Sequence, residues 1–161
     1  MRGTFRSSGS FGKRQEFVAI SELLRRGFDV YLTLVDDQGI DCVIRREDPS
    51  GHPKYLDVQV KARSKDVAPR DAAFFSAFEL RNPRPNYLFM FYSEAAGTWW
   101  ALPSLKLDEW AHRNKSGKNV GKRSIRLANP STTGIRPRPK FRDFEGEAGL
   151  RLIGTTLDSL P

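Results

Sequence analysis

The chain has 161 residues, of which 39% are hydrophobic, and this composition predicts one globular domain that is stable without cross-links. Its single cysteine, Cys42, excludes an internal disulfide and a cysteine-based zinc cluster. The net charge of +8 favours a polyanionic partner, and nucleic acid is the commonest polyanion inside cells. A solvated basic surface without a partner is the alternative.

The first ten residues are rich in glycine, serine and arginine, and we expect them to form a flexible arm. They lack the apolar run of a signal peptide, and no later stretch approaches the length that crosses a membrane. We therefore expect a soluble, cytoplasmic protein with no membrane contact.

The first half of the chain predicts one helix followed by three strands. Apolar residues recur at helical spacing from Phe17 to Leu24, and Gly27 is suited to end that helix. β-Branched and aromatic residues favour a first strand, and polar turns separate it from two more. The helix is expected at residues 11–26, and the strands at 28–35, 40–44 and 55–62.

The second half predicts mixed elements and a basic tail. A short helix is expected at 71–80, a buried central strand at 86–92, a strand that reaches Leu102, and a helix at 103–111. Residues 114–142 are rich in Gly, Pro, Ser, Lys and Arg, so we expect a loop with one strand near 124–127. An amphipathic segment at 145–153 is expected to pack back on the core. The domain prediction is a core at 11–112 with a basic, loop-rich extension at 113–161 packed on the same domain.

The candidate catalytic and metal-binding residues lie mainly on the polar face of the third predicted strand. Asp57, Gln59 and Lys61 alternate there with apolar residues, and Asp41 interrupts an otherwise apolar strand upstream. Mg²⁺ prefers such oxygen ligands, and phosphodiester hydrolysis needs a metal ion, an activated water and cationic stabilisation. Asp41, the Gln59 amide and the Val60 carbonyl are candidate ligands, and Lys61 is placed to act on the attacking water or on the phosphate.

A one-sided basic segment supports a nucleic-acid partner. No acid occurs between Arg113 and Arg142, so this segment is suited to contact backbone phosphates without reading sequence. Cutting both strands of a duplex needs two sites, which favours a homodimer. The predicted contacts are Arg63, Lys65, Arg113, Lys115, Lys118, Lys122 and Arg123.

These residues resemble the motif of the PD-(D/E)XK nuclease superfamily, with small stand-alone members related to Holliday-junction resolvases and restriction endonucleases as the nearest match. The resemblance runs from Gly12–Glu16 through Asp41 to Gln59–Lys61 and covers residues 11 to about 92. It implies an α/β fold with a restriction-endonuclease-like αβββαβ core, in which a mixed central sheet is flanked by helices.

The resemblance also implies roles. Asp41 matches the metal-binding aspartate, Lys61 the catalytic lysine, and Glu16 the helix-borne acid of some branches, which assists through water. Gln59 departs from the usual Asp or Glu and leaves one negative charge fewer around the metal, which Asp57 on the same face is placed to compensate. Mg²⁺, with Mn²⁺ as a substitute, is the implied cofactor.

Each piece of the motif also has a plain structural explanation. Asp41 alone is typical of a satisfied buried acid, and Gln59 with Lys61 is typical of a solvated strand face. Taken together they favour a metal-dependent DNA endonuclease. The alternative is a catalytically silent nucleic-acid-binding or regulatory protein with the same fold.

Overall fold

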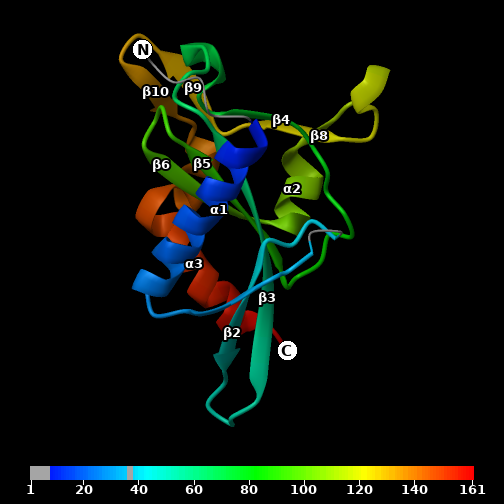
Figure 1. Ribbon diagram of the computed structural model, residues 1–161, viewed down its shortest axis with the longest axis vertical. Helices are drawn as coiled ribbons and strands as arrows, with labels where there is room; N and C mark the ends of the chain where they lie inside the picture. The colour runs from blue at the N-terminus through cyan, green and yellow to red at the C-terminus, as the bar shows by residue number, and fades with distance from the viewer. Residues whose placement is uncertain (1–7, 36–37) are drawn as a thin grey trace.

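The computed structural model describes residues 8–35 and 38–161 and is built around one mixed sheet. The sheet has the strand order β1-β2-β3-β5-β6; β3 and β5 are parallel and the other neighbours are antiparallel (Figure 1). This confirms the predicted α/β fold with a mixed central sheet. The strands are β1 (Asp29–Leu32), β2 (Cys42–Glu47), β3 (Pro53–Arg63), β5 (Tyr87–Ser93) and β6 (Thr98–Pro103).

Two long helices cover one face of this sheet. They are α1 (Ser8–Arg25) and α3 (Gly146–Ser159). The buried face of α1 presents Ala19 and Leu23 to a core that also contains Leu56, Val58 and Ile153. Arg26, just beyond α1, forms a paired ion contact with Glu147 of α3, at 2.7 and 2.8 Å. The helix-side core therefore fixes the direction in which the even-numbered residues of β3 point.

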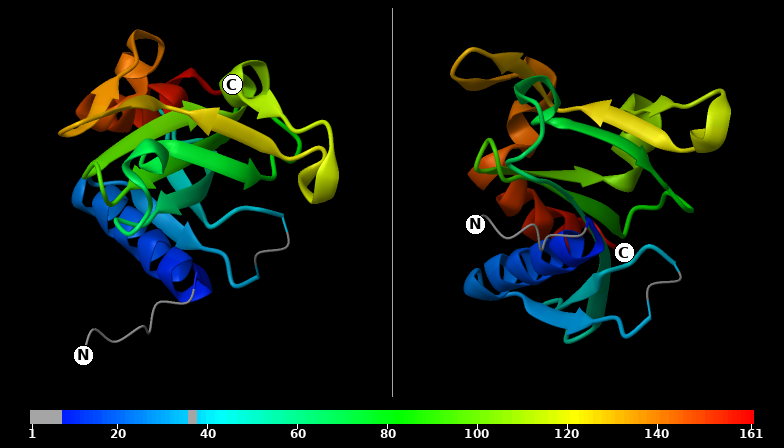
Figure 2. Two further views of the ribbon diagram at one scale, coloured as in Figure 1. Left: turned by 90° about the horizontal axis from the view of Figure 1, so that it is seen from above. Right: turned by 45° about the horizontal axis from the view of Figure 1, so that its top comes forward.

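A second layer of strands covers the other face. It is a three-stranded sheet of order β4-β8-β7, which lies on the side of the central sheet away from α1 (Figure 2). Phe75, Phe78 and Ile125 from this layer pack on Phe89 and Phe91 of β5, so β5 is buried on both faces as predicted for a central strand. The elements are β4 (Phe74–Phe78), α2 (Ser104–Trp110), β7 (His112–Arg113) and β8 (Arg123–Arg126).

The helix predicted at 71–80 is wrong, because β4 occupies that position. Phe75 and Phe78 lie three residues apart, which is a helical spacing, yet both point into the core. The pairing of β4 with β8 shifts register between them, and Ala77 has a φ of +57°. This bulge returns Phe78 to the buried face, so an irregular strand imitates the period of a helix.

The basic extension contains more regular structure than predicted. Its single expected strand is β8, but β7 precedes it and a hairpin of β9 (Ala128–Ser131) and β10 (Gly134–Pro137) follows. The described residues also contain three 3₁₀ turns: η1 (Pro69–Asp71) before β4, and η2 (Gly117–Asn119) and η3 (Pro139–Phe144) within the extension. Glycine and proline in this segment mark tight turns between short strands and not a long loop.

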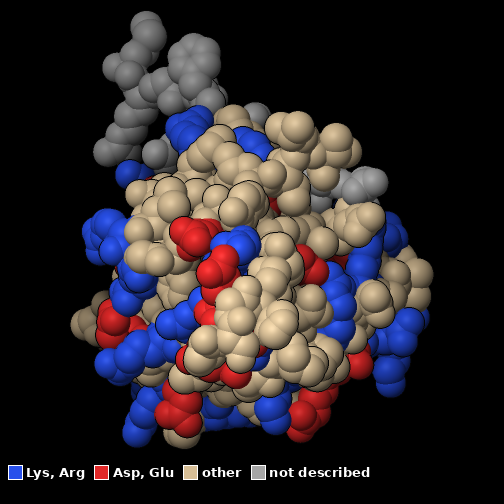
Figure 3. Space-filling model, turned by 90° about the horizontal axis from the view of Figure 1, so that it is seen from below, with Lys and Arg blue, Asp and Glu red and all other residues tan. Residues whose placement is uncertain are grey.

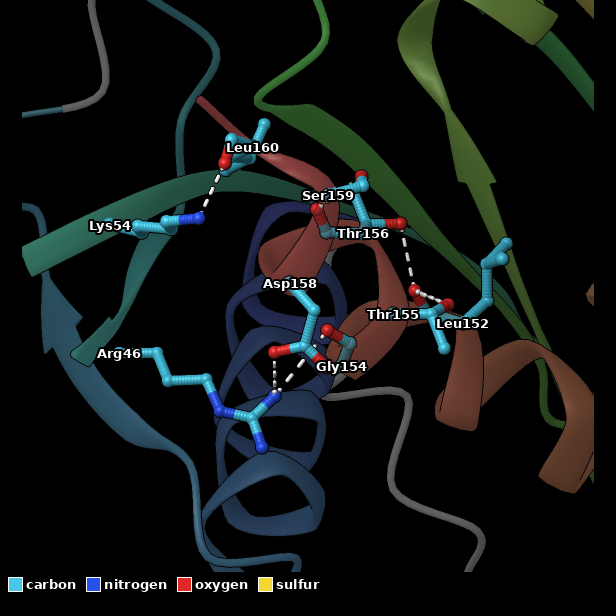
Figure 4. A network of polar contacts seen from close by, with 9 residues as sticks. All are labelled: Arg46, Lys54, Leu152, Gly154, Thr155, Thr156, Asp158, Ser159 and Leu160. Atoms are coloured by element: carbon cyan, nitrogen blue, oxygen red, sulfur yellow. Dashed lines mark hydrogen bonds and ion pairs between the residues drawn. The ribbon is translucent and has the colours of Figure 1, made fainter. Parts of the chain in front are cut away.

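The C-terminal helix is tied to the β2–β3 hairpin next to its turn (Figure 4). Arg46 Nη1 donates to Asp158 Oδ1 at 3.0 Å, and Lys54 Nζ donates to the Leu160 carbonyl at 2.5 Å. Contacts of this exposed kind contribute well under about 1 kcal/mol each, so the apolar face of α3 supplies most of its attachment.

The ends of the chain complete the comparison with the sequence. The first helix begins at Ser8, inside the predicted N-terminal arm, and residues 1–7 lie outside the described part. Within residues 8–35 and 38–161 no helix is long and apolar enough to cross a membrane.

Candidate active site

The polar face of β3 emerges where the strand leaves the helix-side core. Leu56, Val58 and Val60 point into that core, so Gln59 and Lys61 point to the opposite face. Gln59 is 5% exposed, whereas Lys61 is partly exposed. The alternation seen in the sequence therefore places an amide and an ammonium in a row on one side of the sheet.

Asp41 is held against β3 by the backbone of that strand. β2 pairs Cys42 with Val58, so Asp41, one residue earlier, lies opposite Gln59. The Asp41 amide donates to the Val58 carbonyl at 2.9 Å, and the Val60 amide donates to Asp41 Oδ2 at 2.6 Å. The side chain is 8% exposed. A short hydrogen bond to a charged oxygen fixes the carboxylate, which orients it as outer-shell contacts orient metal ligands.

The carboxamide of Gln59 is packed between a hydroxyl and a tight turn. The Tyr87 hydroxyl lies 3.1 Å from Gln59 Oε1 and 2.8 Å from the Gly39 carbonyl, and it shares its proton between these two acceptors. Gly39 has a φ of +72°, and a Cβ atom added there would lie 3.0 Å from Gln59 Nε2. The glycine therefore permits both the turn and the close approach of the amide.

Gly39→Ala tests this packing. The left-handed backbone and the close Nε2 contact both oppose a methyl group, so the variant is expected to lose about 1–2 kcal/mol of unfolding free energy. The check is urea unfolding, with Gly51→Ala as the control. Gly51 also has a positive φ of +82° but no heavy atom within 4 Å of the added carbon. Equal losses in the two variants would show that the Gln59 contact contributes nothing.

Lys61 lies between two pockets. One, of about 300 Å³, is also lined by Gln59 and Tyr87; the other, of about 530 Å³, is also lined by Glu16. The Glu16 carboxylate accepts from Lys13 Nζ at 2.6 Å and its side chain is 20% exposed. Gln59 and Lys61 therefore share one pocket, Lys61 and Glu16 share the other, and Asp41 is linked to them through its hydrogen bond with the Val60 amide.

The Cys42 thiol is buried and lies near two acids of the candidate site. The pKa of its thiol is raised to about 12, mainly by burial and in addition by the negative charges of Asp41 and Glu16. Both acids are thus within electrostatic range of one buried residue at the start of β2. The thiol stays protonated at neutral pH, which excludes a thiolate nucleophile, and Cys42 is a residue of the helix-side core.

The donor set fits a hard cation better than a soft one. Among the described residues no group of three or more His, Cys, Asp and Glu side chains is placed to hold a metal ion. The candidate oxygen ligands lie on adjoining residues: the Asp41 carboxylate accepts from the Val60 amide, the Gln59 amide lies opposite Asp41, and Glu16 lines the pocket on the other side of Lys61. This is the ligand chemistry of Mg²⁺, which commonly uses one or two carboxylates and completes its shell with water.

Asp57 does not compensate for the missing acid in the way the sequence suggests. Arg84 Nη2 donates to Asp57 Oδ2 at 2.5 Å, and the Arg84 guanidinium stacks 4.5 Å from the centre of the Tyr87 ring. Asp57 therefore serves an ion pair beside the pocket. Tyr87 and Arg84 are the residues that sequence reasoning missed; the only signal was a polar-tipped aromatic at the start of a buried strand.

The predicted nucleic-acid contacts divide between the pocket and the surface. Lys122 lines the 300 Å³ pocket, whereas Arg63 Nε donates to the Phe74 carbonyl at 2.6 Å and joins β3 to β4. Arg123 forms an ion pair with Asp108. The remaining predicted contacts are exposed and spread along the chain: Lys65, Arg113, Lys115 and Lys118.

Comparison with solved structures finds a similar fold. The structure described as a bacterial homing endonuclease, I-Ssp6803I, superposes with a TM-score of 0.63 at 18% sequence identity, over 96% of this chain and 98% of the other. At this identity the likeness concerns the fold, which is that of a nuclease. No protein-family model matches the sequence, and no curated protein is detectably similar to it.

Proposed function

We propose that this chain is a metal-dependent endonuclease that hydrolyses phosphodiester bonds of DNA, with a PD-(D/E)XK site in which Gln59 takes the place of the second acid. The observation that carries the proposal is that Gln59 and Lys61 line one pocket of a nuclease-like fold, while the Asp41 carboxylate is bound to the Val60 amide between them. The basic charge of the chain supports a DNA substrate.

The chain's own residues have distinct parts in this proposal. Asp41 and Gln59, with the Val60 carbonyl, would hold a Mg²⁺ ion, which when bound supplies Lewis acidity and an acidified water. Lys61 Nζ lies between the two pockets, where it can hold the attacking water and neutralise charge that develops on the phosphate. Glu16 orients water from the second pocket.

A catalytically silent DNA-binding protein is the second candidate function. It is favoured by one observation: Gln59 Oε1 already accepts from the Tyr87 hydroxyl, so the amide that replaces the acid is engaged within the fold. In this alternative the site is a remnant, and Asp41 has only its structural bonds to β3.

Substrate cleavage separates the two functions. The protein is incubated with end-labelled linear duplex, branched and single-stranded DNA in Mg²⁺, in Mn²⁺ and in EDTA. Metal-dependent cutting of any of these substrates supports the endonuclease. Retained binding with no cutting in either metal ion replaces it with the silent binding protein.

Gln59→Glu tests how the amide at this position affects Mg²⁺ binding and thermal stability. In the metal-free protein a second buried carboxylate opposite Asp41 is expected to lower the melting temperature, because two close negative charges are both desolvated. Mg²⁺ should then raise the melting temperature of this variant by more than it raises that of the wild type. A thermal melt with and without Mg²⁺ measures both effects. A smaller Mg²⁺-induced rise in the variant would contradict the assignment of Gln59 as a ligand.

A further inference from the structure

A second basic pocket lies on the three-stranded sheet. It has a volume of about 390 Å³, and none of its lining residues is acidic. We call it the cationic cup and define it by the six lining residues that matter here: Phe74, Trp110, Arg126, Arg138, Lys140 and Phe141. None of these is a residue of the candidate active site.

A hairpin brings together the three cations of the cup, which lie on either side of it in the chain. Arg126 ends β8, and the β9–β10 hairpin then returns the chain so that Arg138 and Lys140 lie beside it. Arg138 Nη1 donates to the Arg126 carbonyl at 2.6 Å, and Arg126 Nη1 donates to the Arg70 carbonyl. The side chains are thus positioned by neutral backbone oxygens.

Aromatic rings hold the same three cations. Arg126 lies 4.8 Å from the centre of the Phe74 ring, Arg138 lies 5.2 Å from Phe141, and Lys140 Nζ lies 4.5 Å from Trp110. Ring faces and carbonyls orient a cation without neutralising it. The cup therefore concentrates positive charge in a pocket whose lining supplies no negative charge, and such a pocket attracts anions.

The groups around the aromatic rings of the cup determine whether a base or a phosphate of a nucleic acid fits there. A base that stacks needs a bare ring face. Trp110 has Lys106 at 5.1 Å as well as Lys140 over its ring, and the Phe141 and Phe144 rings meet it edge-on at 5.8 and 5.5 Å. A base would have to displace these groups, whereas a phosphate needs only the charged ends of the cations, of which Lys140 is exposed and Arg126 and Arg138 are partly exposed.

We propose that the cationic cup is a second phosphate-binding site, which takes the DNA backbone away from the point of cleavage. The proposal rests on the proposed function in taking DNA as the ligand. Lys122 lines the candidate catalytic pocket and Arg126 the cup, and the four residue steps from one to the other span about 13 Å along β8. That corresponds to about four base pairs of duplex.

The far end of the molecule provides a matched comparison. On the end that carries the β2–β3 turn, basic and acidic residues are intermixed (Figure 3). The arginines there form ion pairs with carboxylates: Arg25 with Glu22, Arg45 with Glu47, and Arg46 with Asp158. Replacing these three removes the same formal charge as replacing the cations of the cup.

Salt-dependent DNA binding tests the cup. Binding of a 30-base-pair duplex is followed by fluorescence anisotropy in EDTA, so the measurement is independent of cleavage. Arg126→Gln/Arg138→Gln/Lys140→Gln is expected to reduce the slope of log K against log salt by about 2–3, since each phosphate contact contributes about 0.9. Arg25→Gln/Arg45→Gln/Arg46→Gln should leave the slope within about half a unit of the wild type.

A single variant keeps the test decisive if the triple variant does not fold. Lys140 is exposed, so Lys140→Gln leaves the fold intact and is expected to reduce the slope by about 1. An unchanged slope in the folded cup variants, or an equal fall in both triple variants, overturns the proposal. If the cup variants reduce the slope of log K against log salt while the wild-type protein cuts no DNA, the phosphate-binding site is supported and the endonuclease function is rejected.

Discussion

Lys61→Met is expected to reduce the rate of DNA cleavage by about 10²–10⁴-fold and to leave DNA affinity nearly unchanged, because in the proposed mechanism the ammonium acts on the reacting water and phosphate and is one of many cations available to DNA. The residue is partly exposed between the two pockets, so an unbranched apolar replacement fits without disturbing the core. Single-turnover cleavage with enzyme in excess measures the rate, and anisotropy in EDTA measures the affinity.

Lys65→Met is the matched control for this variant. It removes the same charge four residues further along the chain, where the side chain is exposed beyond the end of β3. It is expected to weaken binding slightly and to leave the single-turnover rate at saturating enzyme unchanged. Equal losses of rate in Lys61→Met and Lys65→Met would assign Lys61 to binding and remove it from the chemistry.

Asp41→Asn has the second large effect. It abolishes cleavage and weakens Mn²⁺ binding, measured by the electron paramagnetic resonance signal of free Mn²⁺, because a neutral amide replaces the carboxylate at the centre of the site. Asn retains an acceptor for the Val60 amide, so stability in the absence of metal should change little. Asp41→Ala also removes the acceptor and is expected to cost a further 1–3 kcal/mol, roughly the penalty of an unpaired buried N–H group.

Asp57→Asn separates a metal ligand from an ion-pair partner. Asp57 lies on the same face of the sheet but is bound to Arg84, so its replacement should leave Mn²⁺ binding as in the wild type. If Mn²⁺ binding were retained in Asp41→Asn and lost in Asp57→Asn, Asp57 and not Asp41 would be the metal ligand.

The central part of the fold follows from patterns that burial enforces. The alternation from Leu56 to Ala62 predicts β3 because an even-numbered apolar set must face the helix-side core, and the apolar run from Tyr87 to Tyr92 predicts β5 because both of its faces are covered. The turn at Gly39 and the placement of Asp41 opposite Gln59 follow once β2 pairs with β3.

The parts that could not be predicted depend on irregular backbone or on long-range contacts. A bulge at Ala77 gives β4 the spacing of a helix, and nothing local distinguishes the two. The hydroxyl of Tyr87 reaches Gln59 across 28 positions, and Arg84 binds Asp57 across 27, so no sequence pattern joins them. The sequence predicts a basic segment between Arg113 and Arg142 but not the cationic cup within it, because a hairpin brings Arg138 to Arg126 only in the folded chain.

Conversion of supercoiled DNA to open-circular and linear forms tests the central claim most directly. Wild-type protein and Asp41→Asn are purified in parallel and incubated with the plasmid in Mg²⁺ and in EDTA. The proposed site predicts conversion by the wild type in Mg²⁺ alone and no conversion by the variant in either condition. Equal conversion by both proteins, or conversion by the wild type in EDTA, would contradict a metal-dependent site at Asp41.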